Sequence, residues 1–376
     1  MYARMLKPPD DSFFLFGPRG VGKTAWLRST FPDALFFDLL EDRTWNRLQT
    51  EPGRLGEDIP RDHRGIVVID EIQRAPELLN EVHRLIESRR IRFALTGSSA
   101  RKLRRRGVNL LAGRALTLRM HPLTAGELAG DFDLARALRR GTLPRACSIA
   151  DPEPFLQSYV ASWLREEVQQ EGLSRNIAGF GRFLEAASFS QGSALNMASV
   201  ARDCAVPARV VEGYFQILED LLIGYRLPAF TRRAKRRVAL HPKFYFFDAG
   251  VYRAIRPVGP LDSPEEIRGA ALETLFLHHL RAANDYGNLG YGLHYWRTPA
   301  GREVDFVLYG RRGLRAFEVK ASSRVRSGDL DGLHEFLKDY PMAKASLVYL
   351  GDRRWHESGV DVLPVAGVLR DLEGHV

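Results

Sequence analysis

The segment from Gly17 to Thr24 constrains the fold of this chain more than any other part of the sequence. Its residues, in order, are Gly17, Pro18, Arg19, Gly20, Val21, Gly22, Lys23 and Thr24. They match G-x-x-x-x-G-K-[ST] and stand between an apolar run that ends at Phe16 and a helical pattern that begins at Ala25. Glycines let backbone N–H groups curl around phosphate oxygens, and a helix N-terminus adds partial positive charge. We therefore expect an ATP site in which Lys23 contacts the β- and γ-phosphates and Thr24 binds Mg²⁺.

A second motif follows the apolar run Ile66–Ile69, which fits a strand buried on both faces. Asp70 and Glu71 come directly after this run, at the strand end where α/β sheets bind their ligands. We expect Asp70 to hold the Mg²⁺ shell and Glu71 to activate the attacking water. The other interpretation, in which the two acids only cap the next helix, is weakened by the phosphate-loop pattern upstream.

Further polar residues could complete this site. The apolar run Phe93–Thr96 is followed by a glycine, Ser98 and Ser99, and either serine could contact the γ-phosphate or cap the next helix. Arg101 and Arg114 could each stabilise charge in the transition state or bind a partner, and Arg114 is slightly favoured.

The N-terminal part of the chain alternates short apolar runs with helical patterns. The expected strands are Ser12–Phe16, Ala34–Leu39, Gly65–Ile69, Arg92–Thr96 and Ala115–Leu118. This order predicts an α/β architecture with a parallel sheet and crossover helices.

The amino-acid composition limits which binding partners and which cellular compartment we expect for this protein. The 376 residues include 55 Lys and Arg against 46 Asp and Glu, a net charge of +9. Such a balance favours a polyanionic partner, although spare arginine on a soluble protein gives the same count. The two cysteines, Cys147 and Cys204, exclude a disulfide scaffold and a cysteine zinc site, and they fit a cytoplasmic protein. No apolar run is long enough for a membrane helix, so we expect no membrane partner.

Two alternating segments near the C-terminus, Glu303–Tyr309 and Leu314–Lys320, predict a hairpin around a glycine-flanked turn. Symmetric pairing about that turn places Asp305 opposite Glu318, with Lys320 on the face of Glu318. Two facing carboxylates repel each other unless a cation lies between them, and Mg²⁺ or Mn²⁺ suits oxygen ligands. Lys320 would then orient an attacking water. The alternative is a purely structural cluster of ion pairs.

A fourth carboxylate fits the same site. Ser263 and Pro264 open a helix whose apolar face includes Phe276 and Leu277. Glu273 lies three and four residues before that pair, so it points into the apolar face, where a carboxylate without a partner is costly. A metal ion would supply the partner.

The middle of the chain predicts two helices joined by a turn, Ala198–Cys204 and Ala208–Leu221, a spacing that resembles a helix-turn-helix. The second helix would expose a thin base-reading set, Arg209, Glu212 and Gln216. Seven Lys or Arg and no acid lie from Arg226 to Lys243, which predicts salt-sensitive contacts with a nucleic-acid backbone. A protein-docking winged helix and a solvated basic strand pair are the alternatives.

Several segments together resemble a prokaryotic family of ATPases related to the AAA+ class. They are Gly17–Thr24, Val68–Gln73, Leu95–Leu103, Leu111–Arg114, His121–Thr124 and Gly301–Lys320. The resemblance runs over nearly the full length of the chain. It implies an additional-strand (ASCE) P-loop core, a helical and winged-helix middle, and a C-terminal domain of unknown function with a restriction-endonuclease-like α/β fold.

The C-terminal carboxylates resemble the PD-(D/E)XK nuclease motif. Asp305, Glu318 and Lys320 match its three positions, although Val304 stands where a proline is usual. Nuclease folds of this type often carry a glutamate on their first helix, which Glu273 would match. The resemblance therefore implies that Glu273, Asp305 and Glu318 are metal ligands and that Lys320 is catalytic.

These patterns predict four regions: a P-loop ATPase core (1–125), a helical region (126–192), a winged-helix-like region (193–256) and a nuclease-like region (257–376). ATP hydrolysis would control the binding of DNA, branched or single-stranded forms included. The nuclease-like region would process that DNA with Mg²⁺ or Mn²⁺. The alternative is a nucleotide-controlled switch or scaffold that binds DNA or protein without cleaving it. A regulator that binds no nucleic acid is a third interpretation. AAA-related ATPases often act as rings, so a homo-oligomer is a further expectation.

Overall fold

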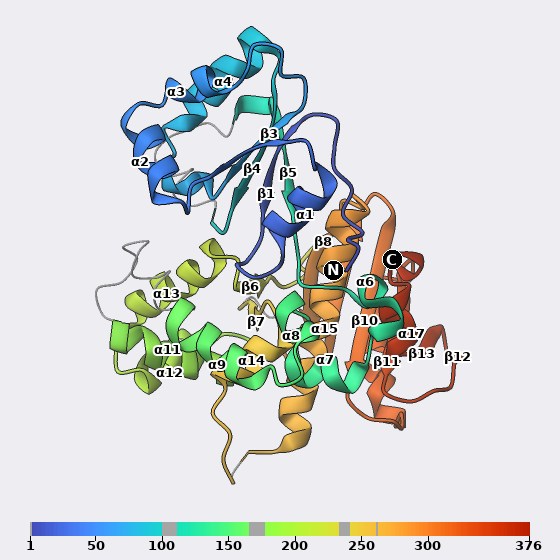
Figure 1. Ribbon diagram of the computed structural model, residues 1–376. Helices are drawn as coiled ribbons and strands as arrows, with labels where there is room; N and C mark the ends of the chain where they lie inside the picture. The colour runs from blue at the N-terminus through green and yellow to red at the C-terminus, as the bar shows by residue number, and fades with distance from the viewer. Residues whose placement is uncertain (1, 100–110, 165–176, 233–240, 261) are drawn as a thin grey trace. The chain divides into compact units, whose positions relative to one another are not determined.

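The computed structural model describes residues 2–99, 111–164, 177–232, 241–260 and 262–376 (Figure 1). The chain divides into two compact units. The smaller unit comprises Ala3–His121 and Asp220–Leu222, and the larger comprises Pro122–Glu219 and Ile223–Val376 with the first two residues. The finer division of the larger unit into three regions stays a prediction. Within the described ranges, no helix has the length and apolar content needed to cross a bilayer.

A five-stranded parallel sheet forms the centre of the smaller unit. Its strands are β1 (Ser12–Phe16), β2 (Leu35–Asp38), β3 (Ile66–Asp70), β4 (Arg92–Gly97) and β5 (Ala115–Arg119). Their order is β2-β3-β4-β1-β5, and every neighbouring pair is parallel. The parallel sheet expected from the sequence is therefore confirmed. β4 lies between β1 and β3, which is the additional-strand arrangement that the resemblance implied.

Short helices connect these strands. They are α1 (Lys23–Thr30), α2 (Asp42–Thr50), α3 (Arg54–Asp58), α4 (Leu78–Arg89) and the 3₁₀ turns η1 (Ile72–Arg74) and η2 (Leu111–Gly113). Every residue of β1 and β3 is buried, as expected of strands covered on both faces. The ring of Trp26 in α1 packs edge-on against Phe13 of β1, with 6.3 Å between the ring centroids. The helix that follows the phosphate loop is thereby anchored to the sheet.

The first half of the larger unit is mostly helical. Its helices are α6 (Ala125–Leu128), η3 (Ala129–Asp131), α7 (Leu134–Arg140), α8 (Pro144–Ser148), α9 (Glu153–Ser158), the π-helix η4 (Tyr159–Leu164), α11 (Ile177–Phe189), α12 (Met197–Asp203), α13 (Ala208–Asp220) and α14 (Ala249–Ile255). Two short strands, β6 (Gly224–Leu227) and β7 (Lys243–Phe246), form an antiparallel pair. The two helices expected around residue 207 are present as α12 and α13, and their assignment as a winged helix stays a prediction.

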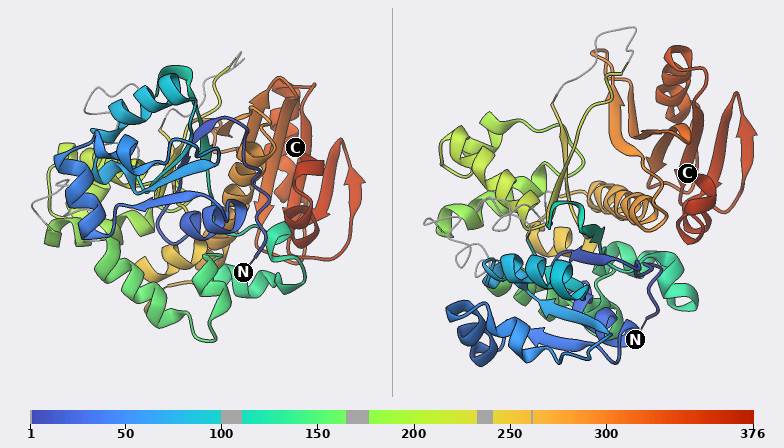
Figure 2. Two further views of the ribbon diagram at one scale, coloured as in Figure 1. Left: turned by 45° about the horizontal axis from the view of Figure 1, so that its top comes forward. Right: turned by 90° about the horizontal axis from the view of Figure 1, so that it is seen from above.

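A six-stranded mixed sheet, seen from two further sides in Figure 2, forms the other half. Its strands are β8 (Gly292–Arg297), β9 (Glu303–Gly310), β10 (Gly313–Lys320), β11 (Lys344–Tyr349), β12 (Trp355–Glu357) and β13 (Val360–Pro364), in the order β12-β13-β11-β10-β9-β8. The helices are α15 (Pro264–Tyr286), α16 (Asp331–Asp339) and α17 (Val365–Arg370), with the 3₁₀ turns η5 (Ser327–Leu330) and η6 (Glu373–His375).

Two helices cover opposite faces of this sheet. Phe276 of α15 contacts Phe306 of β9 and Phe317 of β10, which pair across the hairpin. The next residue along β9, Val307, instead joins the core cluster that contains Phe336 of α16. Because successive side chains of a strand point to opposite faces, α15 and α16 lie on different sides of the sheet.

A buried histidine links α15 to the start of the larger unit. His279 Nε2 accepts a hydrogen bond from Ala125 N at 2.8 Å, and Nδ1 lies 2.8 Å from Leu275 O. The acceptor role of Nε2 means that Nδ1 carries the proton of a neutral ring. Burial lowers the pKa of His279 from 6.5 to about 4.

This low pKa predicts a pH-dependent stability. Between pH 6.5 and 4 the unfolded chain binds a proton at His279 that the folded chain does not, so stabilisation present above pH 6.5 is lost as the pH falls. Lowering the pH from 7 to 5 should cost about 2 kcal/mol of unfolding free energy through this residue. In urea titrations, His279→Gln should show correspondingly less pH dependence than the wild type. The exposed His356→Gln is the control, and equal pH dependence in all three proteins would contradict the assignment.

Candidate nucleotide and carboxylate sites

The phosphate loop leaves β1 at Phe16 and is shaped by the chain that follows β5. Met120 N donates to Phe16 O at 2.8 Å, and a Cβ built on Gly17 would lie 2.5 Å from Met120 O. A side chain at Gly17 would therefore collide with the backbone. Gly20 and Gly22 have φ of 83° and 96°, a left-handed conformation that glycine adopts without strain. Close approach and backbone conformation thus account for the glycines of the motif.

Lys23 begins α1 and points back into the loop. Its side chain is only 5% exposed, and Nζ donates to Gly17 O at 2.8 Å and to Pro18 O at 3.3 Å. The ammonium is therefore held by carbonyl oxygens of the loop, in the manner suited to phosphate oxygens.

Asp70 brings three segments of the smaller unit together. It is 1% exposed, and its Oδ2 accepts a hydrogen bond from Thr24 Oγ1 at 2.6 Å. Its Oδ1 accepts a second from the hydroxyl of Thr96. Burial raises the pKa of the Asp70 carboxyl, and these two hydroxyls act against the rise. A hydroxyl and a carboxylate in contact fit the protein ligands of nucleotide-bound Mg²⁺.

Glu71 is fixed by its neighbours in a left-handed conformation, with φ of 60°. Its N–H donates to Thr96 Oγ1 at 3.0 Å, and its carboxylate accepts from the side-chain amide of Gln73. Ser98 Oγ lies 3.0 Å from Gln73 Nε2 and 3.5 Å from Glu71 Oε2. A left-handed backbone at a residue such as Glu71 costs about 1–3 kcal/mol, and it persists only where surrounding contacts offset the strain.

Sequence reasoning missed Thr96 and Gln73. Thr96 ends an apolar run and looks like an ordinary strand residue, while Gln73 lies in a turn whose shape depends on Glu71. The available signal was the polar end of β4, which had drawn attention only to Ser98 and Ser99. Ser98 does lie beside Glu71, and Ser99 is buried.

The two candidate arginines are placed differently. Arg114 forms an ion pair with Glu87 of α4. Its expected role at the phosphates stays a prediction. Arg101 lies outside the described residues.

In the larger unit, Asp305 departs from the expected hairpin register. The β9–β10 pairing follows that register from the turn to the Phe306–Phe317 pair and ends there, where β9 also pairs irregularly with β8. Asp305 therefore does not form a ladder pair with Glu318. Its Oδ2 instead accepts a hydrogen bond from Val319 N at 2.9 Å. A local irregularity of this kind redirects a side chain, which simple pairing by residue number does not capture.

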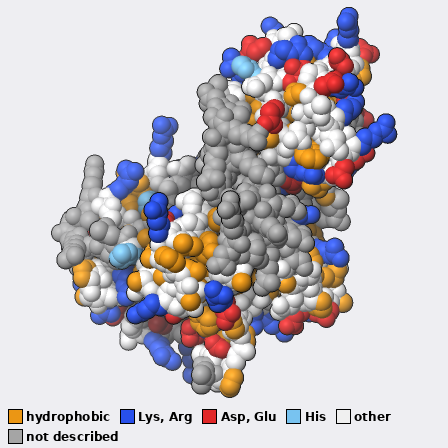
Figure 3. Space-filling view, turned by 90° about the vertical axis from the view of Figure 1, so that its left-hand side faces the viewer, with side chains coloured by type: hydrophobic (Ala, Val, Ile, Leu, Met, Phe, Trp, Pro, Cys, Tyr) orange, Lys and Arg blue, Asp and Glu red, His pale blue; other side chains and the backbone are white. Residues whose placement is uncertain are grey.

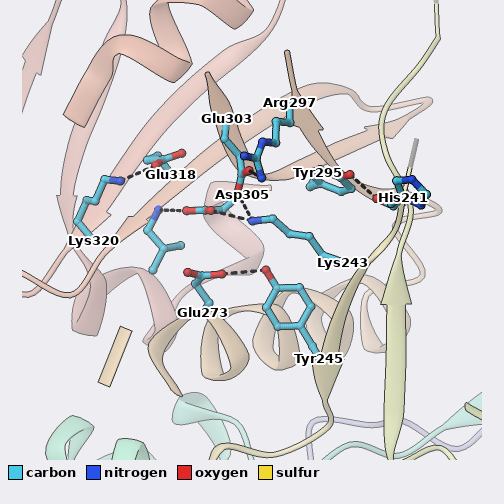
Figure 4. Close-up of polar contacts among 11 residues, drawn as sticks. His241, Lys243, Tyr245, Glu273, Tyr295, Arg297, Glu303, Asp305, Glu318 and Lys320 are labelled. Atoms are coloured by element: carbon cyan, nitrogen blue, oxygen red, sulfur yellow. Dashed lines mark hydrogen bonds and ion pairs between the residues drawn. The ribbon is translucent and has the colours of Figure 1, made fainter. Parts of the chain in front are cut away.

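A lysine from β7 reaches the other oxygen of this carboxylate (Figure 4). Lys243 Nζ lies 3.3 Å from Asp305 Oδ1 and forms a second ion pair with Glu303. The side chain is 2% exposed. Burial acts to lower the pKa of Lys243, but the surrounding Tyr245, Asp305, Glu273 and Glu303 hold it well above its ordinary value. The alternative of a solvated basic strand pair therefore does not hold for Lys243.

Glu273 and Glu318 each have a separate partner. Tyr245 OH donates to Glu273 Oε2 at 2.8 Å, and Lys320 Nζ donates to Glu318 Oε1 at 2.7 Å. Burial and the charge of Asp305 raise the pKa of Glu273 to about 8 and that of Glu318 well above its ordinary value. Glu318 Oε2 is buried without a hydrogen-bond partner.

The predicted metal site is tested by these contacts. Carboxylates suit Mg²⁺ or Mn²⁺, but the ammonium of Lys243 already lies at one oxygen of Asp305, and Val319 N donates to the other. Within the described part of the chain, no three His, Cys, Asp or Glu side chains are grouped so that they could hold a metal ion. The three carboxylates lie near one another, yet with Lys243 in contact with Asp305 the cluster does not fit a bound metal.

The presumed base-reading helix is also engaged within the protein. Arg226 of β6 donates to Glu212 at 2.5 Å, to Gln216 at 3.0 Å and to Glu219 at 2.6 Å, all on α13. Two of the three expected base-reading residues thus contact the strand that follows their helix. The guanidinium of Arg226 is itself engaged in these contacts.

Comparison with known proteins assigns the first part of the chain. Residues 10–129 match the model of an AAA domain, while 131–262 and 268–368 each match a domain of unknown function. No curated protein matches significantly. The AAA match and the additional-strand sheet together identify the N-terminal part as a P-loop ATPase domain.

Solved structures resemble the chain only weakly. Orc1 of Aeropyrum pernix in complex with DNA is 17% identical, with a TM-score of 0.28, and the match covers 66% of this chain and 87% of that one. VC1899 of Vibrio cholerae is 14% identical, with a TM-score of 0.23 and coverage of 97% and 96%. Can2 of Sulfobacillus thermosulfidooxidans in complex with cyclic tetra-adenylate is 8% identical, with a TM-score of 0.22 and coverage of 96% and 97%. Scores of this size identify neither ligand nor partner.

The Thr96 contacts predict a catalytic defect without a binding defect. Thr96→Val removes the hydroxyl that links Asp70 to the backbone of Glu71. We expect kcat for ATP hydrolysis to fall by about tenfold to a hundredfold, the effect of losing hydrogen bonds worth about 1.5–3 kcal/mol at a charged group. Binding of a fluorescent ATP analogue should change little. Thr50→Val, on the exposed surface of α2, is the control, and an unaltered kcat in Thr96→Val would contradict this role.

Proposed function

We propose that this chain is an ATP-dependent DNA-binding protein whose N-terminal domain hydrolyses ATP. The loop Gly17–Thr24 binds the triphosphate, with Lys23 against the β- and γ-phosphates. Thr24 and Asp70 hold Mg²⁺, which neutralises phosphate charge when bound. Glu71 accepts the proton of the attacking water.

The observation that carries this proposal is a chain of hydrogen bonds from Thr24 through Asp70 and Thr96 to Glu71. It joins the phosphate loop, the acidic end of β3 and the end of β4. If Asp70 and Glu71 only capped a helix, Asp70 would have no reason to contact the loop. The side chain of Gln73 supports the same role, because it orients the carboxylate of Glu71.

DNA is proposed as the partner on grounds of charge. The chain carries a net charge of +9, and polyanions are the partners that such a surplus favours. In Figure 3, Lys and Arg side chains are scattered over the visible face among Asp and Glu. Such a distribution suits phosphate contacts more than base reading, because base reading needs a grouped set of side chains. Of the basic stretch, Arg233, Lys235, Arg236 and Arg237 lie outside the described residues.

The nuclease-like region is proposed to process the bound DNA, because Glu273, Asp305, Glu318 and Lys320 lie in one part of the larger unit. The second candidate is a switch or scaffold that binds DNA or protein without cutting it. A specific observation favours that candidate: Asp305 is already balanced by Val319 N and Lys243.

ATP hydrolysis is tested with two variants that separate binding from chemistry. Lys23→Ala should lose ATP binding, because the phosphate charge is no longer countered. Glu71→Gln should keep binding and lose at least about a hundredfold in kcat, the lower end of the effect of a general base. Glu57→Gln, on the surface of the same unit, is the control. Equal turnover in Glu71→Gln and the control would exclude Glu71 as the base.

DNA processing is tested on plain and branched DNA with ATP and with Mg²⁺ or Mn²⁺. We expect cleavage by the wild type and its loss in Lys320→Ala, while both hydrolyse ATP at the same rate. Lys338→Ala, an exposed lysine of α16, is the control. If no protein cleaves DNA but DNA affinity depends on ATP and falls with salt, the scaffold candidate is the correct one. Absence of DNA binding at low salt would exclude both candidates.

A further inference from the structure

The ammonium of Lys243 lies 3.3 Å from Asp305 Oδ1. It contacts Asp305 and Glu303 and is almost completely buried. A lysine is rarely buried to this extent unless it is paired. Its position is therefore set by the carboxylates of β9 and not by exposure to solvent.

One short strand supplies the partners of two carboxylates. Lys243 and Tyr245 lie two residues apart on β7, so they share a face of the strand. Lys243 contacts Asp305, and Tyr245 donates to Glu273. β7 lies in the residues matched by the middle family model, whereas both carboxylates lie in the C-terminal one. The middle of the chain thus balances a cluster that belongs to the next domain.

The third carboxylate of the cluster remains partly unsatisfied. Glu318 is 7% exposed, and its Oε2 has no hydrogen-bond partner, while Lys320 occupies only Oε1. Figure 4 shows Glu318 beside Asp305, with Lys243 reaching Asp305 from another direction. A buried oxygen without a partner is unusual in a folded protein, and it fits a ligand of the cluster that the chain itself does not supply.

A divalent ion and Lys243 would compete for the same oxygen. An ion such as Mg²⁺ binds oxygen at about 2.1 Å. If it bound Asp305 Oδ1, it would lie within about 5.4 Å of an ammonium that stands 3.3 Å from that atom. Two positive charges at this distance repel each other strongly in a buried site, where little water screens them.

We propose that Lys243 is the resident cation of the carboxylate cluster, and that its ammonium and a divalent metal ion exclude one another at Asp305. The inference rests on the proposed processing of DNA at these carboxylates with Mg²⁺ or Mn²⁺, and it names the regulation of that site. Metal would bind there only as Lys243 gives up its contacts, so that the chain on its own holds the site in a metal-free form.

The test measures binding of Mn²⁺ to the full-length protein by electron paramagnetic resonance, without nucleotide or DNA. All proteins carry Asp70→Asn, which removes the metal ligand of the ATP site. Lys243→Met is compared with the parent and with Lys338→Met, an exposed lysine of the same unit. Lys243→Gln serves as a second neutral variant in case the methionine variant does not fold, and thermal unfolding verifies both.

The neutral variants at Lys243 should bind one Mn²⁺ at least ten times more tightly than the parent and Lys338→Met, and adding Asp305→Asn should abolish the gain. Mn²⁺ should also raise their unfolding temperature. Equal, Asp305-dependent binding in the parent and the variants would overturn the exclusion while leaving the proposed metal site intact. No Asp305-dependent binding in any folded variant would overturn both. ATP turnover of Lys243→Gln with Asp70 restored should match the wild type in every case.

Discussion

Burial of Asp70 is the constraint on which the ATPase domain depends. A charged carboxylate that is 1% exposed is costly unless donors surround it. Hydroxyls from the phosphate loop and from β4 supply those donors, so three segments far apart in the sequence must meet at one point. The order of the strands follows the same requirement, because β4 can present Thr96 to Asp70 only as the direct neighbour of β3. The strand order of the sheet and the contacts of Asp70 therefore depend on each other.

The larger unit also contains a buried carboxylate, Asp305, and there a charged side chain is one of its partners. Asp305 is balanced by a backbone N–H from the neighbouring strand and by the ammonium of Lys243. Removing one partner of a buried ion pair costs about 3–5 kcal/mol, because the other charge stays behind without compensation. β7 is thus tied to the C-terminal sheet by electrostatics, with Tyr245 adding a contact to α15. The donors at Asp70 are neutral hydroxyls, which add no positive charge beside that carboxylate, whereas one partner of Asp305 is itself a cation.

The sequence allowed local features to be predicted and left long-range partners hidden. The phosphate loop, the five strands of the first sheet and most of the β9–β10 register follow from spacing, glycine positions and apolar periodicity. Thr96 and Lys243 could not be found in this way, because their roles come from partners on other strands. Asp305 shows the limit within a single hairpin. Symmetric pairing about the turn placed it opposite Glu318, but the irregularity in β9 turned its side chain towards Val319 N.

Several of the basic side chains are engaged in contacts within the protein. Arg226 is committed to the acids of α13, and Lys243 to those of β9. Arg232 stacks on the ring of Tyr309, with 5.1 Å from its Cζ to the ring centroid. A count of positive residues therefore overstates the charge that a polyanion could meet, because part of it balances acids inside the fold. Any phosphate contacts must come from residues outside these internal pairs, which makes backbone binding by dispersed side chains a better match to the chain than a dedicated reading helix.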